Sequence, residues 1–249
     1  MKYTTLEGLS LTAIPYGESH RIVRFFSRDL GKIAVMAHGA RKQLSKFALV
    51  SEPATHSTLV LAHNPRSDLF TLKEAEVLQS FIAIKQQYHD LQAIFAFVGM
   101  LNDVTGESDS DSYLFDSIIA LLRGYNAGSI SNGLFHVLFR MAGLRLLGRK
   151  PDWTTCSLCG RQSSSLTVLH GQVQCLVCGE TQPGIVIREA VLEIFRCVDD
   201  GTLHDFSALN AHPALPDAQQ TLQTLLHQNI LDKSRKKGHF EQHGQRHCT

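Results

Sequence analysis

The sequence lacks long hydrophobic runs. The longest nearly unbroken apolar stretch is residues 94–101, whereas a helix that spans a bilayer needs about 18 or more apolar residues. The first twenty residues include Glu7, Pro15 and Glu18 and hold no continuous apolar segment, so we expect no secretory leader. These absences argue against a membrane-spanning helical protein.

Cysteine and nucleotide-binding motifs are also scarce. Only 6 of 249 residues are cysteine, too few for a fold stabilised mainly by disulfides. The sequence contains no GxxxxGK[ST] loop, no GxGxxG loop after a strand and no HExxH motif. We therefore expect no catalytic residues in this chain, and any ATP hydrolysis should belong to a partner protein.

The overall charge is nearly balanced, with 24 basic and 23 acidic residues, but the distribution is uneven. Residues 20–46 hold one acidic residue, Asp29, and a large excess of basic ones. A second basic cluster lies at residues 233–237. A local excess of this kind is typical of a surface that binds a polyanion. The basic residues of the first cluster are Arg21, Arg24, Arg28, Lys32, Arg41, Lys42 and Lys46.

The first eighty residues have the pattern of short β-strands. They are rich in β-branched and aromatic residues, and Gly31 in one of the loops tolerates a positive φ. About five strands in eighty residues predict a small barrel or sandwich, of which the oligonucleotide-binding (OB) barrel is one example. The predicted strands are residues 3–14, 20–26, 32–37, 57–62 and 68–72.

The rest of the chain is mainly helical. We expect one helix to begin at Asp111 and to end before Gly124, because Asp favours the N-cap and Gly the C-cap. Residues 134–147 are apolar on nearly every side, which is typical of a helix in a bundle core. Residues 188–198 and 217–231 are amphipathic.

Four cysteines form two C-x-x-C pairs separated by 15 residues, a spacing that predicts a four-cysteine zinc site. Gly160 and Gly179 follow the pairs and should ease the turns. Two redox disulfides are the alternative reading. The predicted ligands of one structural Zn²⁺ are Cys156, Cys159, Cys175 and Cys178. A fifth cysteine, Cys197, lies in an amphipathic segment, where we expect a small core residue.

Four thiolates would leave the zinc ion no open position for water. A nucleobase deaminase needs such a position, and it also needs a His or Cys and a Glu before a P-C-x-x-C segment. No P-C-x-x-C follows Glu180, so we do not expect a zinc enzyme. The zinc would instead stabilise a ribbon that is too poor in large apolar residues to fold alone.

Alternation along residues 20–26 suggests how the basic strand pair could act. Arg24 and Phe26 should lie on one face, and Val23 and Phe25 on the other. With strict alternation, only one of the two phenylalanines faces the barrel core. The exposed ring could stack on bases while the arginines neutralise phosphates. Alternatively, both rings are buried and the arginines form an ordinary solvated surface.

The order of these motifs resembles the RecO family of bacterial recombination mediators. The N-terminal match includes GESHRIVRFFSRDLGKI at residues 17–33, AHGARK at residues 37–42 and Ser45. Further matches are LKEAE at residues 72–76, the apolar segments at 114–122 and 134–143, and the late cysteine pairs. One departure is Leu44, because the family loop usually has a basic residue immediately before the serine.

The resemblance implies an α+β multidomain protein, with an N-terminal five-stranded OB-fold barrel, a helical bundle domain and an inserted four-cysteine zinc ribbon. Residues 1–80 would be the nucleic-acid-binding OB domain, and residues 81–150 the first part of the helical domain. Residues 151–182 would be the ribbon, and residues 183–249 the C-terminal part of the helical domain with a polar tail. A cytoplasmic, nucleoid-associated protein is expected.

The family binds single- and double-stranded DNA, anneals complementary strands, engages the C-terminal tail of the single-strand binding protein SSB and acts with RecR to load RecA. The resemblance therefore places DNA on the seven basic residues of the first cluster. The acidic SSB tail needs an apolar pocket rimmed by cations. The candidate cations for that pocket are Arg123, Arg140 and Arg145.

Two other functions are compatible with the residues themselves. An RNA-binding or transcription-associated protein could also combine an OB fold with a zinc ribbon, and the basic cluster does not separate it from a DNA-binding protein. A scaffold whose helices bind only proteins is the second alternative. Loss of DNA binding after neutralisation of Arg41 and Lys42 would argue against the scaffold.

Overall fold

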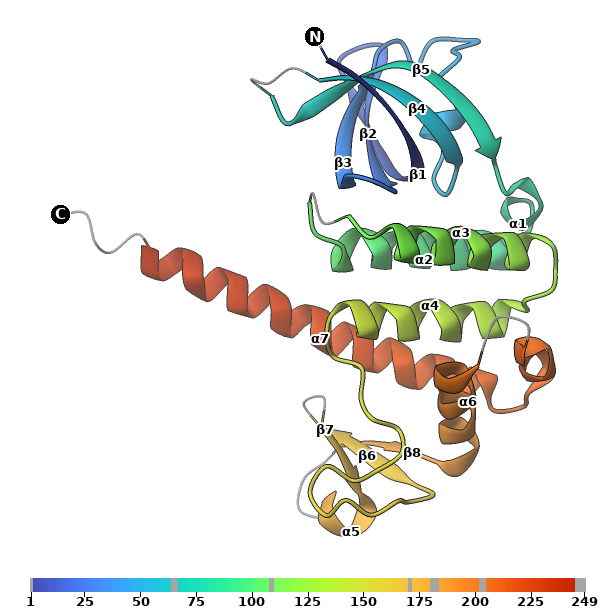
Figure 1. The fold of residues 1–249 in the computed structure, drawn as a ribbon, viewed down its shortest axis with the longest axis vertical. Coiled ribbons are helices and arrows are strands. Elements are labelled where there is room, and N and C mark those ends of the chain that lie inside the picture. The colour runs from blue at the N-terminus through green and yellow to red at the C-terminus, as the bar shows by residue number, and fades with distance from the viewer. Residues whose placement is uncertain are drawn as a thin grey trace. The chain divides into compact units, whose positions relative to one another are not determined.

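The chain forms two compact units, residues 1–132 and residues 133–249. The computed structural model describes residues 2–63, 67–107, 110–169, 172–179, 184–201 and 205–244. The predicted α+β, multidomain fold class is confirmed by a closed barrel, several helices and a small three-stranded sheet (Figure 1), together with a cluster of four cysteines. Among the described residues, no helix is both long and apolar enough to cross a bilayer.

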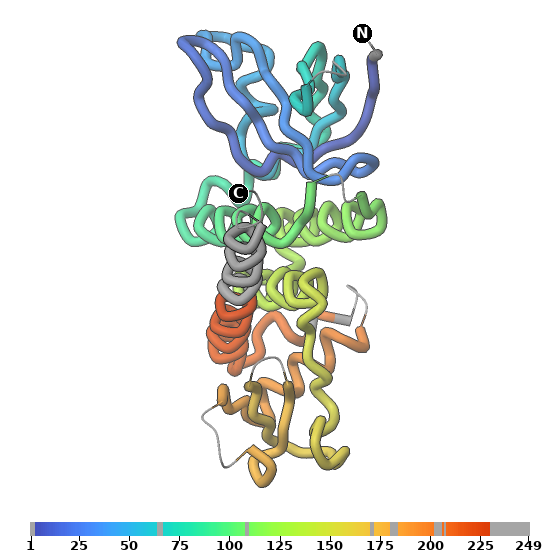
Figure 2. The backbone as a smooth tube through the Cα atoms, turned by 90° about the vertical axis from the view of Figure 1, so that its left-hand side faces the viewer, coloured from blue at the N-terminus to red at the C-terminus, as the bar shows by residue number. Residues whose placement is uncertain are grey.

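Five strands close into a barrel in the order β1-β2-β3-β5-β4. Figure 2 shows the backbone of this region in blue to cyan. All neighbours are antiparallel except β3 and β5, which run parallel. Gly31 has a φ of 66° at the end of the β2–β3 loop, as expected. The closed barrel confirms the predicted OB-type fold. The strands are β1 (Lys2–Tyr16), β2 (His20–Ser27), β3 (Gly31–Ala37), β4 (His56–His63) and β5 (Leu69–Gln79), with a 3-10 turn at Leu49–Ser51.

The barrel has an apolar interior supplied by alternate residues of its strands. Val23 and Phe25 of β2, Val35 of β3 and Leu59 and Leu61 of β4 are fully buried in one cluster. Each such side chain contributes about 1.5–3 kcal/mol by leaving water. The first unit therefore has a core of its own.

Three helices follow the barrel in the first unit: α1 (Ile82–Lys85), α2 (Tyr88–Val104) and α3 (Ser112–Asn126). Asp111 caps α3 as predicted, because its Oδ1 accepts a hydrogen bond from the Leu114 N–H at 2.9 Å.

The predicted end of this helix before Gly124 is wrong. The glycine is needed for packing, since a Cβ at this position would lie 2.8 Å from Cδ1 of Ile130. The helix ends beyond it, where Gly128 has a φ of 75° and its N–H bonds the Tyr125 carbonyl.

The second unit combines helices with a three-stranded sheet of order β7-β6-β8. The buried face of α7 contains Ala218, Leu222, Leu225 and Leu226, as the amphipathic pattern predicts. The elements are α4 (Asn132–Leu146, starting at the unit boundary), β6 (Leu166–Leu169), β7 (Gln172–Cys175), α5 (Leu176–Gly179), β8 (Ile185–Ile187), α6 (Glu189–Asp200), a 3-10 segment (Asp205–Ala211) and α7 (Leu215–Gly244).

The prediction that Cys197 is a core residue is wrong, because this side chain is exposed. Helix α6 buries Val191, Leu192, Ile194 and Phe195. Cys197 lies off that face of the helix, although the same amphipathic pattern led to its assignment.

Candidate metal centre and nucleic-acid interface

The four predicted cysteine ligands come together around the β6–β7 hairpin. Their Sγ atoms all lie within 4.8 Å of one another, and those of Cys159 and Cys175 are 3.9 Å apart. In a tetrahedral site, zinc–sulfur bonds of about 2.3 Å place neighbouring sulfur atoms about 3.8 Å apart. The cluster therefore has the dimensions of a four-thiolate metal site.

The two C-x-x-C pairs reach this point by different turns. After the first pair, Gly160 has a φ of 69° and its N–H donates to the Cys156 carbonyl at 2.8 Å, so this glycine eases the turn as predicted. In the second pair, Cys175 ends β7 and Cys178 lies on the single helical turn α5, which also contains Gly179. A strand end and a helical turn thus bring the second pair of thiols to the first.

The thiols of Cys156 and Cys178 have pKa values that are shifted in opposite directions. Hydrogen bonds from the backbone N–H groups of Cys175 and Cys159 lower the pKa of Cys156 to about 6. Hydrogen bonds with the neighbouring thiols, first that of Cys175, raise the pKa of Cys178 to about 12. Four sulfur atoms this close would not all ionise without a cation between them, and a soft divalent cation suits this donor set.

The segment that leads into the cysteines packs on α6. The buried ring of Trp153 lies 4.7 Å from that of Phe195, centroid to centroid. Arg196 donates from Nε to the Trp153 carbonyl at 2.9 Å and from Nη2 to the Ser163 carbonyl at 3.1 Å. Residues 151–182 carry a single basic residue, Arg161.

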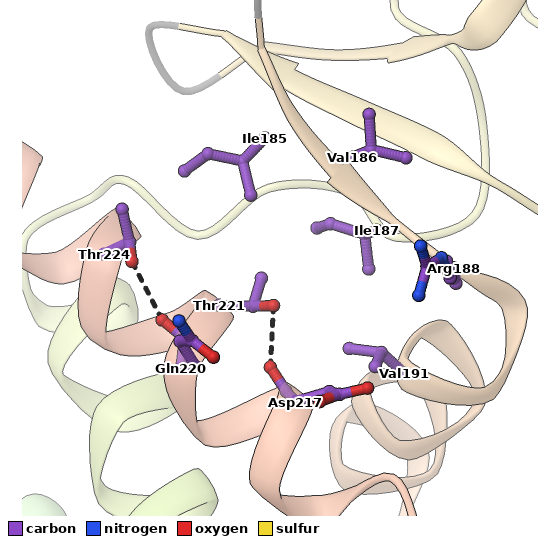
Figure 3. A pocket seen from close by; sticks show the side chains of 9 residues that line it. All are labelled: Ile185, Val186, Ile187, Arg188, Val191, Asp217, Gln220, Thr221 and Thr224. Carbon is purple, nitrogen blue, oxygen red and sulfur yellow. Dashed lines mark hydrogen bonds between the residues drawn. The ribbon is translucent and has the colours of Figure 1, made fainter.

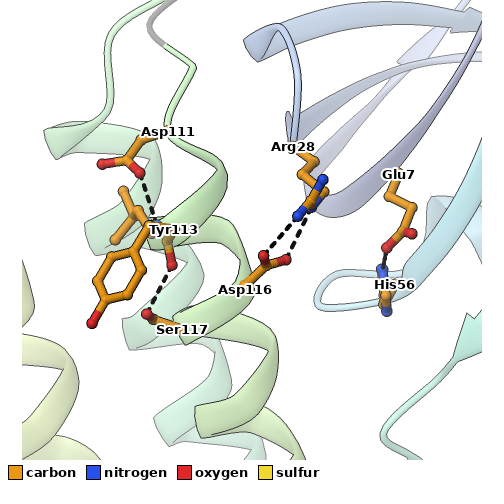
Figure 4. Close-up of polar contacts among 8 residues, drawn as sticks. Glu7, Arg28, His56, Asp111, Tyr113, Asp116 and Ser117 are labelled. Atoms are coloured by element: carbon orange, nitrogen blue, oxygen red, sulfur yellow. Dashed lines mark hydrogen bonds and ion pairs between the residues drawn. The ribbon is translucent and has the colours of Figure 1, made fainter.

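At one end of the β2–β3 hairpin, two of the seven predicted DNA-binding cations contact the helices of the first unit. Arg28 donates to both carboxylate oxygens of Asp116 on α3, at 3.0 and 2.8 Å (Figure 4). Lys32 donates to the carbonyls of Asn102 and Thr105 at the C-terminal end of α2, at 2.7 and 3.0 Å. Helix C-termini attract cations. Both residues therefore join the barrel to its helices.

Helix α3 covers the outward-facing ring of β2, so the alternative in which both phenylalanines are buried is confirmed. Phe25 and Phe26 are both fully buried, so an exposed phenylalanine on this strand is ruled out. Phe25 lies in the barrel core, whereas Phe26 faces outward and packs against Phe115 of α3, with centroids 6.0 Å apart. His56 also packs on Phe115 and bonds Glu7 at 2.8 Å (Figure 4). Burial lowers the pKa of His56, and Glu7 partly offsets that effect.

At the other end of the hairpin, the loop after β3 folds onto the β1–β2 turn. The Arg41 N–H donates to the Ser19 carbonyl at 3.0 Å, and its guanidinium donates to the Gly17 carbonyl at 3.2 Å. The Gly39 N–H donates to Nδ1 of His20 at 3.0 Å. The Arg41 and Lys42 side chains are exposed here. The turn at residues 17–19, the adjoining residues 20–24 of β2 and the loop at residues 38–46 together are named the open end of the barrel.

The remaining predicted cations belong to β2 or to this loop. Arg21 pairs with Glu52 at 3.6 Å. Arg24, midway along β2, is exposed, and so is Lys46, which lies 5.0 Å from the Phe47 ring. Within the described residues, Arg24, Arg41, Lys42 and Lys46 form no ion pair. Leu44, the departure from the family pattern, is fully exposed with a φ of 60°.

The end of β1 supplies exposed residues that the sequence analysis did not select. Ile14 and Tyr16 are 57% and 53% exposed. The predicted strand stopped at residue 14 and so left out Tyr16. Strand β1 runs to Tyr16, and because residues two apart on a strand share a face, extending the predicted strand by two residues would have placed the tyrosine beside Ile14.

The three arginines suggested for the SSB tail differ in their surroundings. Arg123, in the first unit, is exposed and donates to Gln79 at 2.8 Å. Arg145, in the second unit, has a side chain 63% exposed and pairs with Asp199 at 3.3 Å. Arg140 is buried, stacks 4.7 Å from the Phe139 ring and bonds Nδ1 of His136 at 2.6 Å.

A separate groove of about 360 Å³ lies between β8, α6 and α7 (Figure 3). Arg188 and Asp217 give it one charge of each sign. The threonine hydroxyls on α7 already donate to backbone carbonyls of their own helix, so they offer little to a ligand. Its lining contains none of the three predicted arginines. The lining residues are Ile185, Val186, Ile187, Arg188, Val191, Asp217, Gln220, Thr221 and Thr224.

The sequence matches the family model described as recombination protein O N terminal over residues 1–81 and the one described as recombination protein O C terminal over residues 86–238. It is 30% identical over 198 residues to the DNA repair protein RecO of Bacillus cytotoxicus, with 78% of each chain covered. The DNA repair protein RecO of Bacillus cereus is 29% identical over 206 residues, with 81% of this chain and 82% of that protein covered. The RecO of Bacillus mycoides is 28% identical over the same length. A barrel, a helical region and a four-cysteine cluster, together with these matches, show that this chain belongs to the RecO family of DNA repair and recombination proteins.

Proposed function

We propose that this protein is a non-enzymatic recombination mediator that binds single- and double-stranded DNA at the open end of its barrel. The observation that carries the proposal is a group of exposed cations, none of which forms an ion pair with another described residue: Arg24, Arg41, Lys42 and Lys46. Arg21 adds positive charge to the same region, although it forms an ion pair with Glu52. Arg28 and Lys32 keep the barrel on its helices, so we assign them a supporting role.

Strand annealing follows from this charge. Two single strands repel each other because both are polyanions, and a protein that neutralises several phosphates on each strand lowers the repulsion and releases counterions. Such binding does not depend on base sequence, so any complementary pair can be brought together. No bond is made or broken in this step.

For the metal, we propose one structural Zn²⁺ held by Cys156, Cys159, Cys175 and Cys178. The four sulfur atoms lie within 4.8 Å of one another, so together they would fill a tetrahedral shell and leave no position for substrate or water. The ion would supply the ordering that the ribbon lacks in apolar core, with a binding free energy on the order of 10 kcal/mol.

Partner proteins complete the proposal. We infer that the chain engages the acidic C-terminal tail of SSB and acts with RecR to help load RecA in the cytoplasm, on nucleoid DNA. Arg123 and Arg145 are suited to meet an acidic tail because they are exposed. Arg140 is buried beside His136, so we expect it to shape α4 rather than touch a partner.

The test is annealing of complementary oligonucleotides coated with SSB, or with SSB that lacks its last residues. We expect acceleration over the protein-free rate with intact SSB and a smaller acceleration with the truncated form. Arg24→Ala combined with Arg41→Ala should reduce the acceleration, whereas Arg161→Ala, which removes an exposed ribbon arginine, should not. Annealing no faster than without protein would contradict the proposal.

A further inference from the structure

The outward face of β1 and β2 carries a strip in which Ile14, Tyr16 and Arg24 are exposed and His20 and Ile22 are half-buried. Tyr16 lies opposite His20, Ile14 opposite Ile22, and Thr12 opposite Arg24 in the antiparallel pairing. Directly opposed residues of such a pair share a face, with Cβ atoms about 5 Å apart. The β1–β2 strip is defined as Ile14, Tyr16, His20, Ile22 and Arg24.

The residues next to the strip along each strand show which way its side chains point. Ala13 on β1 and Val23 on β2 pack in the barrel interior, and successive residues of a strand point to opposite sides. The strip therefore faces away from the core. Ile14 and Tyr16 expose more than half of their surface, and an apolar group of this kind next to charges is typical of a binding surface.

Cations adjoin the strip on two sides. Arg24 is its last member, and the guanidinium of Arg41 is fixed to the carbonyl of Gly17, the residue next to Tyr16. The ring of His38 lies 4.9 Å from that of His20, so the loop that carries Arg41 is packed against the strip. Glu18 is the one acidic residue of the segments 14–24 and 38–42, against four basic residues.

We propose that the β1–β2 strip is a base-stacking platform on which Tyr16 stacks against an unpaired base while Arg24 and Arg41 contact the flanking phosphates. This inference rests on the proposed DNA binding and specifies its substrate class as single-stranded DNA. Bases within a duplex already stack on one another and present only their edges, so Tyr16 can add affinity only where a base is unpaired. The cations, in contrast, attract both kinds of DNA.

The structure also shows why another ring could not take this role. Phe26, two residues after Arg24 on the same face of β2, is covered by Phe115 of α3. The helices thus close one end of the outward face and leave the Tyr16 end accessible. Charge complementarity favours a polyanion there over an apolar protein segment.

The experiment measures affinity for single-stranded and for duplex oligonucleotides of equal length at one salt concentration. Tyr16→Ala should weaken single-strand binding about 10-fold, since stacking on one aromatic ring contributes about that factor, and should change duplex binding by less than about twofold. Tyr16→Phe keeps the ring and should restore single-strand affinity. Tyr3→Ala is the matched control, because Tyr3 lies on the same strand and is 61% exposed.

A second readout reports stacking directly. A single strand that contains 2-aminopurine should lose fluorescence when the wild-type protein stacks on the base, and should lose less with Tyr16→Ala. Equal loss of affinity for both DNA forms, or unchanged affinity for both, would overturn the platform while DNA binding itself stands. Failure of the wild-type protein to bind either form would instead remove the proposed function on which the platform rests.

Discussion

The barrel and the ribbon of this protein are stabilised in different ways and carry different charges. The barrel buries a cluster of large apolar side chains and presents seven basic residues between positions 20 and 46. The ribbon has short strands, four clustered thiols and Arg161 as its single basic residue. We therefore propose that the barrel folds on its own core and attracts a polyanion, whereas the ribbon depends on a metal and does not attract one.

Because the two regions differ in this way, the stability of the ribbon and the DNA affinity of the barrel can be changed separately. If the ribbon has only a structural role, removal of its metal should leave DNA affinity nearly intact. If the barrel alone carries the DNA interface, substitutions in the barrel should change DNA affinity without any effect on metal content.

The largest effect is expected from loss of the metal. Cys175→Ser removes one of four ligands, and binding of a structural metal is worth on the order of 10 kcal/mol in such modules. We expect bound zinc to be lost and amide protons of β6 and β7 to exchange rapidly, with the barrel amides still protected. Metal analysis and hydrogen exchange measure the two outcomes.

The matched control is Cys197→Ser, because this cysteine is exposed on α6 and lies outside the cluster. It should retain full metal content. Full zinc content in Cys175→Ser would show that the four-thiolate assignment is wrong. Rapid exchange of the barrel amides in that variant would show that the barrel also depends on the metal.

The next largest effect concerns the barrel core. Phe25 is fully buried, and truncation of a buried phenylalanine to alanine typically costs about 3–5 kcal/mol. Urea unfolding of Phe25→Ala should show that loss, with the zinc stoichiometry unchanged. Tyr3→Ala serves as the exposed aromatic control. A loss below about 1 kcal/mol for Phe25→Ala would mean that the barrel core does not set the stability.

Lowering the pH should cause a smaller loss of stability, which arises in the second unit. His136 accepts a hydrogen bond at Nδ1 from Arg140, and burial together with this arginine lowers its pKa to about 4. The unfolded chain protonates this histidine near pH 6.5, whereas the folded chain does so only near pH 4. Its contribution to stability is therefore present above pH 6.5 and declines as the pH falls towards 4, by about 2 kcal/mol at pH 5.

The measurement is the free energy of unfolding at pH 7 and pH 5 for the wild type and for His136→Gln. Subtraction of the two proteins at each pH cancels the protonation of the thiols and of the other histidines. The variant should lose less stability than the wild type between the two values. Identical losses would place His136 in a solvated position.

Local signals in the sequence were sufficient for part of this structure. The five strands follow from runs of β-branched and aromatic residues, the cap at Asp111 from its residue type, and the metal cluster from the spacing of Cys156, Cys159, Cys175 and Cys178. Each of these depends on residues close together in the chain. The domain boundaries after residues 80, 150 and 182 stay predictions.

The features that sequence reasoning missed depend on contacts between distant segments. Arg28 meets a partner 88 residues away, Asp116, and this contact links the barrel to α3, while its contact with DNA stays a prediction. Phe26 points outward as alternation requires, but α3 covers it. No periodicity within β2 could have revealed a helix that begins at Ser112.

The most direct test of the DNA interface is the dependence of single-strand affinity on salt concentration. Each phosphate contact contributes about 0.7 to the slope of log affinity against log salt. We predict that Arg24→Ala combined with Arg41→Ala lowers this slope by between one and two units, whereas Arg28→Ala leaves it nearly unchanged. An unchanged slope in the double variant would contradict the open end of the barrel as the DNA site and would direct attention to the basic residues at 233–237.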